Sequence, residues 1–330
     1  MKDGEAYITG TLKEEIRSIL TASGACAVGF AKAGPVDSSE WDRFGDWLSR
    51  GDNAGMEYMR NYPELRRDPR LLLEGAKTVI SLAFSYNPAK WRHKDSGTIA
   101  AYAYGKDYHK ELRRLLKPAV REISGKFPEA HFRICVDSAP ILERYWAQKA
   151  GIGIKGDNGA LIIPGFGSFI FLVEIITDLG ITPDAPASSD CGHCGACHRA
   201  CPGNAIGENG AIDCRRCISY LTIEHRGEWT LPESVAAMQT AEGRSTIYGC
   251  DICLRVCPHN RGVSPTPIQS FRPSEKMLSI TAADILKLKD EEDLRSLLPS
   301  SPMSRAGIEG LLRNVGFSRS FGIEESSRNR

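Results

Sequence analysis

Nine of the eleven cysteines of this chain lie between residues 191 and 257. The stretch CGHCGACHRACP at 191–202 has the form C-x2-C-x2-C-x3-C-P, and C-x2-C-x3-C-P returns at 250–258. In two-cluster iron–sulfur proteins such a run places three thiolates on one cluster, and its fourth cysteine ligates the other cluster. The chemistry that these residues predict is therefore electron transfer through two [4Fe–4S] clusters.

The spacing divides the cysteines into two ligand sets. The first set is expected to be Cys191, Cys194, Cys197 and Cys257. The second is expected to be Cys201, Cys250, Cys253 and one further thiolate, and the spacing leaves open whether this is Cys214 or Cys217. Two structural zinc ions are the alternative, because C-x2-C pairs also bind zinc. Zinc sites do not need the crossover run twice, so we favour iron–sulfur clusters.

The composition is that of an ordinary globular protein, with 42% hydrophobic and 25% charged residues and a net charge of +1. No global field therefore favours nucleic acid or a membrane surface, although local basic patches are possible. The most apolar stretch is interrupted by Glu174 and Asp178, and the N-terminus has neither an apolar signal core nor a twin-arginine pair. We expect a cytoplasmic protein without membrane spans, in which clustered cysteines bind metal rather than form disulfides.

Residues 1–185 have the pattern of an α/β domain. Helices are expected at 11–24, 107–124 and 139–151, and strands at 25–31, 78–86, 131–137, 160–164 and 169–176. The apolar-poor stretch TPDAPASSD at 182–190 marks a boundary. We expect a ferredoxin-like cluster domain at 186–262, a short helical segment at 263–320 and a disordered tail at 321–330.

Two weaker motifs lie in the α/β part. GIGIKG at 151–156 has the form G-x-G-x-x-G, but it follows a helix and leads into a strand, so we expect a helix end and turn rather than a dinucleotide site. DYHKEL at 107–112 begins like the corrinoid motif D-x-H-x-x-G, but Leu112 stands where the glycine belongs. We therefore expect His109 to be a helix-surface residue rather than a cobalt ligand.

Asp137 follows an apolar strand and precedes a helix. Spacing alone does not decide between two roles. Asp137 or Ser138 is a helix N-cap, or Asp137 is an acid at the carboxyl end of a strand, where clefts of α/β sheets open.

These motifs together resemble the epoxyqueuosine reductase family, iron–sulfur and cobalamin enzymes that complete queuosine synthesis on tRNA. The resemblance runs from about residue 40 to 320 through VDSAPILERYWAQKAGIG, CGHCGACHRACP, YGCDICLRVCPHN and SRAGIEGLLRNVG. Its most specific phrase is CISYLTIE, beginning at Cys217. The resemblance implies that Cys217 completes the second ligand set and that Cys214 is spare.

The resemblance also implies cofactors and partners. The α/β half would bind cobalamin base-off without a histidine ligand, in a pocket that includes the positions of Arg60, Tyr108, Asn158 and Ser168. Asp137 would be the proton donor, with its pKa raised by a dry pocket, as electrons from an external low-potential donor pass through both clusters to cobalamin. The substrate would be a tRNA anticodon stem-loop, held across the cluster domain and the helical segment, and a monomer is the simplest expected state.

The chain departs from the family pattern at several neighbouring positions. Tyr104 stands at an arginine position, Ile154 at a tryptophan position, Asp157 at a lysine position and Leu254 at a glutamine position. The eight ligand positions and Asp137 are kept. Two alternatives therefore remain: another corrinoid and iron–sulfur reductase of the dehalogenase kind, and a plain two-cluster electron carrier.

Overall fold

The computed structural model describes residues 7–93 and 96–328. Its centre is a four-stranded sheet with the order β1-β2-β7-β4. The strands are β1 (Ala27–Lys32), β2 (Thr78–Ser85), β7 (Ile170–Thr177) and β4 (Phe132–Cys135). Every neighbouring pair is antiparallel. The carboxyl ends of β2 and β4 consequently lie at the same end of the sheet as the amino ends of β1 and β7.

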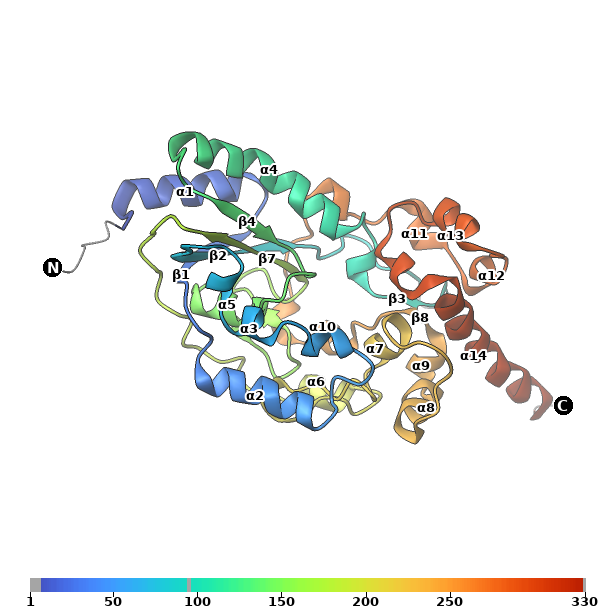
Figure 1. Ribbon diagram of the computed structural model, residues 1–330. Coiled ribbons are helices and arrows are strands. Elements are labelled where there is room, and N and C mark those ends of the chain that lie inside the picture. The colour runs from blue at the N-terminus through green and yellow to red at the C-terminus, as the bar shows by residue number, and fades with distance from the viewer. Residues whose placement is uncertain (1–6, 94–95, 329–330) are drawn as a thin grey trace.

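The two faces of this sheet are covered by different helices. Alternate side chains such as Phe30, Leu82 and Val173 enter the largest core together with α1 (Gly10–Ala22) and α4 (Tyr108–Lys126), which lie over one face (Figure 1). The opposite face packs on the short helix α5 (Glu143–Lys149), whose Trp146 is buried against Val79 and Ile176. This alternation follows from the period of two along a strand.

The predicted elements are present, with shifted bounds. The helix expected at 139–151 begins only at Glu143, so residues 136–142 form a turn between β4 and α5. Residues 151–153 form a turn after α5 with Gly151 at a φ of 76°, as expected for GIGIKG, and they lead into β5 (Ile154–Lys155), paired with β6 (Leu161–Ile162). Neither Asp137 nor Ser138 caps α5, because Leu142 occupies that position.

The cysteine-rich part consists of short helices and loops. Its helices are α6 (Ala196–Ala200), α7 (Ile218–Ile223), α8 (Pro232–Gln239), α9 (Ala241–Ser245) and α10 (Ile252–Arg255). Earlier in the chain, α2 (Ser38–Ser49), the 3-10 turn η1 (Glu57–Arg60) and α3 (Pro63–Arg67) connect β1 to β2. The C-terminal segment has α11 (Glu275–Ser279), α12 (Ala282–Ile285), α13 (Glu291–Leu297), the 3-10 turn η8 (Pro302–Ala306) and α14 (Gly307–Arg328). The tail expected at 321–330 is thus helical up to Arg328, and residues 329–330 lie outside the described residues.

Main-chain hydrogen bonds connect the cysteine-rich part to the N-terminal half. Strand β3 (Thr98–Ile99) pairs in parallel with β8 (Thr246–Tyr248). Just beyond these strands, the buried carboxylate of Asp251 accepts the N–H of Ala101 at 2.5 Å. Residues of the C-terminal segment enter the same core as the sheet.

None of the helices in the described ranges combines the length and the apolar composition that crossing a bilayer requires.

Candidate active site and cluster-binding region

The turn after β4 carries Asp137 at a positive φ of 54°. Its Oδ2 accepts a hydrogen bond from the Tyr108 hydroxyl at 3.0 Å and lies 2.8 Å from Nε2 of His109. Tyr108 and His109 are the first two residues of α4, which Asp107 caps by accepting the His109 N–H. Asp137 therefore meets the start of α4 at the edge of the sheet, with 47% of its side chain exposed.

His109 lies between two carboxylates. Its Nδ1 is 2.8 Å from Oδ1 of Asp107, and its Nε2 faces Asp137. A neutral imidazole can donate from only one nitrogen, so this geometry favours the imidazolium. The hydrogen bond to Asp137 is the main cause that raises the pKa of His109, and the bond to Asp107 adds to it. His109 lies in α4 with 30% of its side chain exposed, as expected for a helix-surface residue, but its contacts with two carboxylates were not expected.

The pKa of Asp137 departs from its ordinary value in the direction opposite to our expectation. Burial raises it, but the hydrogen bonds from His109 and Tyr108 and the charge of His109 lower it more, and the net pKa lies below the ordinary value. The effect of burial on the pKa is smaller than the effect of the hydrogen-bond donors, which stabilise the carboxylate. The directions of both shifts place a proton shared by this pair on His109 rather than on Asp137.

Two further acids lie behind the turn. Glu143, the first residue of α5, accepts the main-chain N–H of Asp137 at 2.8 Å. Burial and the charge of Asp137 raise the pKa of Glu143 to about 7. Glu174, in β7, is fully buried, and neither of its carboxyl oxygens has a hydrogen-bond partner among the described residues. Burial, with the charge of Glu143 as a second cause, raises the pKa of Glu174 well above its ordinary value.

We expect Glu174→Gln to stabilise the protein increasingly as the pH rises. Because the folded-state pKa of Glu174 is raised, folding at a pH above the unfolded value of about 4.3 requires proton uptake, so wild-type stability falls as the pH rises towards the folded pKa. Each pH unit in this window changes the stability by up to about 1.4 kcal/mol. Glutamine does not titrate and escapes this loss.

The measurement is the difference in unfolding free energy between variant and wild type at pH 5, 6, 7 and 8. The exposed Glu129→Gln is the matched control, whose difference should not change with pH. A pH-independent difference for Glu174→Gln would contradict a raised pKa.

The cysteines meet in two places. One hollow is lined by the four cysteines of the first expected set, Cys191, Cys194, Cys197 and Cys257, together with Gly156, Asp157 and Asn158. At the second place, burial raises the pKa of the Cys253 thiol, and the neighbouring Cys217 and Cys201 raise it further. Burial and the neighbouring Cys217 and Cys253 likewise raise the pKa of the Cys250 thiol. Thiolate donors in two groups of four suit two iron–sulfur clusters, and iron binding would replace the thiol protons.

Cys214 adjoins the second group: burial and the neighbouring Cys217 raise the pKa of its thiol, and Cys217 and Cys250 pack against the core that contains it. The Cys214 thiol lies 3.8 Å from the carbonyl of Ile212, and its side chain is buried in this core with Trp229 and Met238. Cys217, but not Cys214, is among the charges that raise the pKa values of the Cys250 and Cys253 thiols, and Cys201 in turn raises the pKa of Cys217.

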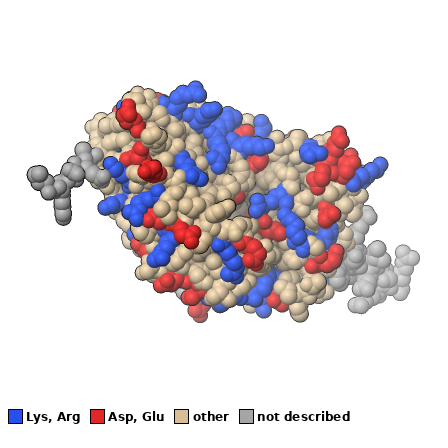
Figure 2. Space-filling model, in the orientation of Figure 1, with Lys and Arg blue, Asp and Glu red and all other residues tan. Residues whose placement is uncertain are grey.

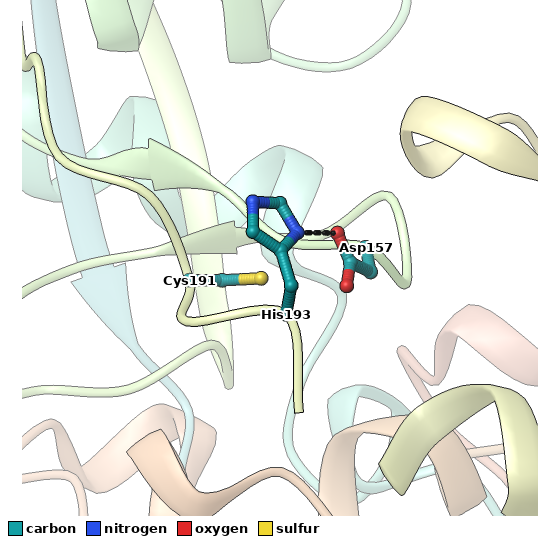
Figure 3. Close-up of side chains that lie close together, drawn as sticks. All are labelled: Asp157, Cys191 and His193. Carbon is teal, nitrogen blue, oxygen red and sulfur yellow. Dashed lines mark hydrogen bonds and ion pairs between the residues drawn. The ribbon is translucent and has the colours of Figure 1, made fainter. Parts of the chain in front are cut away.

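The rim of the first hollow carries an acid and a histidine. Figure 3 shows Asp157 hydrogen-bonded to Nδ1 of His193, at 2.8 Å, with the thiol of Cys191 beside them. The three ligand atoms lie within 4.8 Å of one another. Because Cys191 belongs to the first expected cluster set, this trio is the edge of that site. Asp157 thus introduces a negative charge, bonded to an exposed imidazole, at a position where the family pattern has lysine.

The other expected cofactor positions fall in two regions. The Asn158 amide donates to the carbonyl of Cys253 at 3.3 Å, and the Ser168 N–H donates to the side-chain oxygen of Asn260 at 2.7 Å. Asn158 therefore contacts the second cysteine run, and Ser168 contacts the turn that follows it. Arg60, the last residue of η1, donates to the carbonyl of Leu48 in α2 at 2.7 Å, in a separate region. Of these positions, only Tyr108 directly contacts Asp137.

The sequence of this chain is similar to those of proteins whose function is known. A family model described as "Epoxyqueuosine reductase QueG, DUF1730" matches residues 66–138, and a model for a 4Fe-4S double cluster binding domain matches residues 190–260. The epoxyqueuosine reductase of Cyclobacterium marinum is 37% identical over 300 residues, which cover 89% of this chain and 94% of that protein. The chain belongs to the epoxyqueuosine reductase family. The Escherichia coli enzyme of the same name is 35% identical over 87% of this chain and 76% of its own.

Solved epoxyqueuosine reductases have the same fold. One, crystallised with an epoxyqueuosine-modified tRNA stem loop, has a TM-score of 0.81 at 29% identity and covers 93% of this chain and 80% of its own. The Bacillus subtilis enzyme, in a structure whose catalytic aspartate loop is swung out of the active site, has a TM-score of 0.81 at 28% identity with the same coverage.

Sequence reasoning missed several neighbours of Asp137 that this member of the epoxyqueuosine reductase family places at the site. Glu143 lies within the predicted helix at 139–151, and nothing in that pattern distinguishes it from a surface residue. The sequence D-Y-H at the start of the next helix back in the chain was the feature that could have indicated a role for His109. Tyr58 is 44% exposed, and the Arg305 guanidinium lies 5.8 Å from its ring centroid. Tyr58 and Arg305 come from η1 and η8, so only the folded chain brings them together.

Proposed function

We propose that this protein reduces epoxyqueuosine to queuosine in the anticodon loop of tRNA. The observation that carries the proposal is the family membership over nearly the whole chain, combined with Asp137 held by Tyr108 and His109 at the edge of the sheet. The reaction takes up two electrons and two protons. Both epoxide C–O bonds break, a C=C bond forms, and the oxygen leaves as water.

Asp137 is the proposed catalytic acid, and His109 resupplies it. His109 holds a proton 2.8 Å from the Asp137 carboxylate, while Asp107 fixes the orientation of the imidazole. A proton passed from Nε2 to Oδ2 makes Asp137 a neutral acid that can protonate the departing oxygen. The Tyr108 hydroxyl donates to Oδ2 of Asp137 and so orients the acid, and the Tyr108 ring stacks on Phe171 with 4.4 Å between the ring centroids.

We assign the ligands of the two clusters as the sets Cys191, Cys194, Cys197, Cys257 and Cys201, Cys217, Cys250, Cys253. We also propose base-off cobalamin beside Asp137, with Arg60, Tyr108, Asn158 and Ser168 as candidate contacts. Both ring nitrogens of His109 are engaged by carboxylates, which disfavours histidine ligation of the cobalt. When bound, these groups would supply the two electrons from an external low-potential donor.

The tRNA anticodon stem-loop is the proposed partner, and a tRNA substrate agrees with a cytoplasmic enzyme. A monomer is the simplest state and is proposed as such. An RNA loop can present an unstacked base to a recessed acid without opening a duplex. Figure 2 shows Lys and Arg side chains gathered over α4, the helix that begins at Tyr108. We retain 1–185, 186–262 and 263–320 as the proposed division into catalytic, cluster and helical parts.

The test is conversion of an epoxyqueuosine-containing tRNA stem-loop by the anaerobically reconstituted protein, followed by nucleoside mass spectrometry. We expect queuosine to form, a corrinoid spectrum shifted towards base-off, and stem-loop binding that weakens with salt as counterions are released. Corrinoid binding without RNA binding would favour a dehalogenase-like reductase. Two clusters without corrinoid would favour an electron carrier. Either result would overturn the proposal.

A further inference from the structure

The Asp137 turn is held by its backbone as well as by its side chain. A positive φ is strained for a residue other than glycine, so surrounding contacts must maintain it. Tyr108 and His109 hold the carboxylate, whereas the N–H of Asp137 is accepted by Oε1 of Glu143 at 2.8 Å. The next N–H, of Ser138, bonds to the carbonyl of Val136 within the turn.

Glu143 is well placed for this contact. It is the first residue of α5, six positions after Asp137, and its half-buried side chain reaches back over the turn. Helix α5 itself is anchored under the sheet by the buried Tyr145, Trp146 and Ala147. The Glu143 carboxyl group therefore links the turn to a rigid element.

Glu174 lies behind this contact. Its strand position is opposite Cys135, the last residue of β4, in the register of the sheet. Two neighbouring carboxyl groups cannot both ionise readily, and the charge of the half-buried Glu143 is one cause that raises the pKa of the fully buried Glu174. Glu174 remains the protonated partner, so it adds no second negative charge next to the Glu143 oxygen that holds the turn.

We propose that Glu143 is a positioning residue that fastens the Asp137 turn in the active site through the main-chain N–H of Asp137. The inference rests on the proposed role of Asp137 as the catalytic acid. The Bacillus subtilis relative shows that a catalytic aspartate loop of this family has a second position, swung out of the active site. In this chain, loss of the Glu143 contact releases the turn and moves the acid away from the reacting oxygen.

The test compares Glu143→Ala, Glu143→Asp and Glu143→Gln in the holoenzyme. Alanine removes the acceptor and aspartate withdraws it by one methylene, whereas glutamine keeps an oxygen that can accept the N–H. Hydrogen–deuterium exchange of the 136–142 peptide should be about tenfold faster in the alanine variant and close to wild type in the glutamine variant. Glu291→Ala is the matched control, because Glu291 accepts the Ile308 N–H at 2.9 Å in another part of the chain, and it should leave this peptide unchanged.

Turnover gives the second readout. We expect Glu143→Ala to lower kcat about a hundredfold with little change in KM for the stem-loop, and glutamine to restore most of the rate. Added to Asp137→Asn, Glu143→Ala should cost nothing more, because both act through the same acid. Wild-type exchange of the turn in Glu143→Ala, or an additive loss in the double variant, would overturn the inference. If the wild type itself has no turnover, the proposed function fails, and the exchange data still decide whether Glu143 fastens the turn.

Discussion

Replacement of Asp137 by asparagine should reduce queuosine formation by about 100- to 10,000-fold, the range typical of a lost general acid. Asparagine has the same shape and can still accept from Tyr108, but it cannot take a proton from His109 and deliver it. The iron and corrinoid contents of the variant should equal those of the wild type, because Asp137 is not among the proposed metal ligands. Single-turnover kinetics with the prereduced holoenzyme isolates this step from electron supply.

The matched control for Asp137→Asn is Asp178→Asn. Asp178 forms a similar pair with His131, with 2.8 Å between Oδ2 and Nδ1, outside the site. We expect the control to keep the wild-type rate. Turnover by Asp137→Asn within a few-fold of wild type would remove Asp137 from the mechanism and leave His109 as the acid to examine.

Replacement of Cys217 by serine should remove one of the two clusters, whereas Cys214→Ser should keep both. Cys217 is among the charges that raise the pKa of Cys253, whereas Cys214 is not, and Cys214 is a buried member of the apolar core against which Cys217 packs. A serine hydroxyl is a poor substitute for a thiolate ligand of iron. Because electrons for the reaction would have to pass the damaged site, turnover should also fall to the background of the assay.

Iron and acid-labile sulfide per chain, with electron paramagnetic resonance of the reduced protein, measure the cluster content. The two serine variants are each other's controls, since they lie three residues apart and remove the same atom. If Cys214→Ser loses a cluster and Cys217→Ser keeps two, the ligand assignment is reversed. Equal loss in both variants would indicate a folding defect of the loop, and Cys217→Ala with Cys214→Ala would then separate the two.

Within each cysteine run the information is local, because ligands two or three residues apart must lie on one loop whatever the rest of the fold does. The spacing therefore predicts which cysteines share a loop, whereas the assignment of Cys257 to the first set and of Cys201 to the second follows the crossover of two-cluster proteins and stays a prediction. The choice between Cys214 and Cys217 is different. It depends on which thiol faces a loop more than thirty residues away, and spacing carries no such information.

The surroundings of Asp137 depend on tertiary structure. The α/β pattern predicted most of the strands, but strand patterns do not specify direction, and the sheet is antiparallel. The argument from the cleft of a parallel sheet therefore does not apply to Asp137, although β4 does end at the edge where β2 ends. The pKa of Asp137 failed as a prediction because it depends on donors from α4, which the sequence separates from Asp137 by almost thirty residues.

The hydrogen bond of Asp251 links the second cysteine run to the N-terminal half. Asp251 lies between Cys250 and Cys253, and its carboxylate holds the N–H of Ala101, a few residues before the helix that begins with Tyr108 and His109. Metal that orders the cysteine loop would thereby add its binding free energy to the stability of the distant acid-bearing half. The folding of the chain would then depend on the supply of iron. A polypeptide made under iron starvation would lack its clusters, and the part of the fold that holds Asp137 would be less stable.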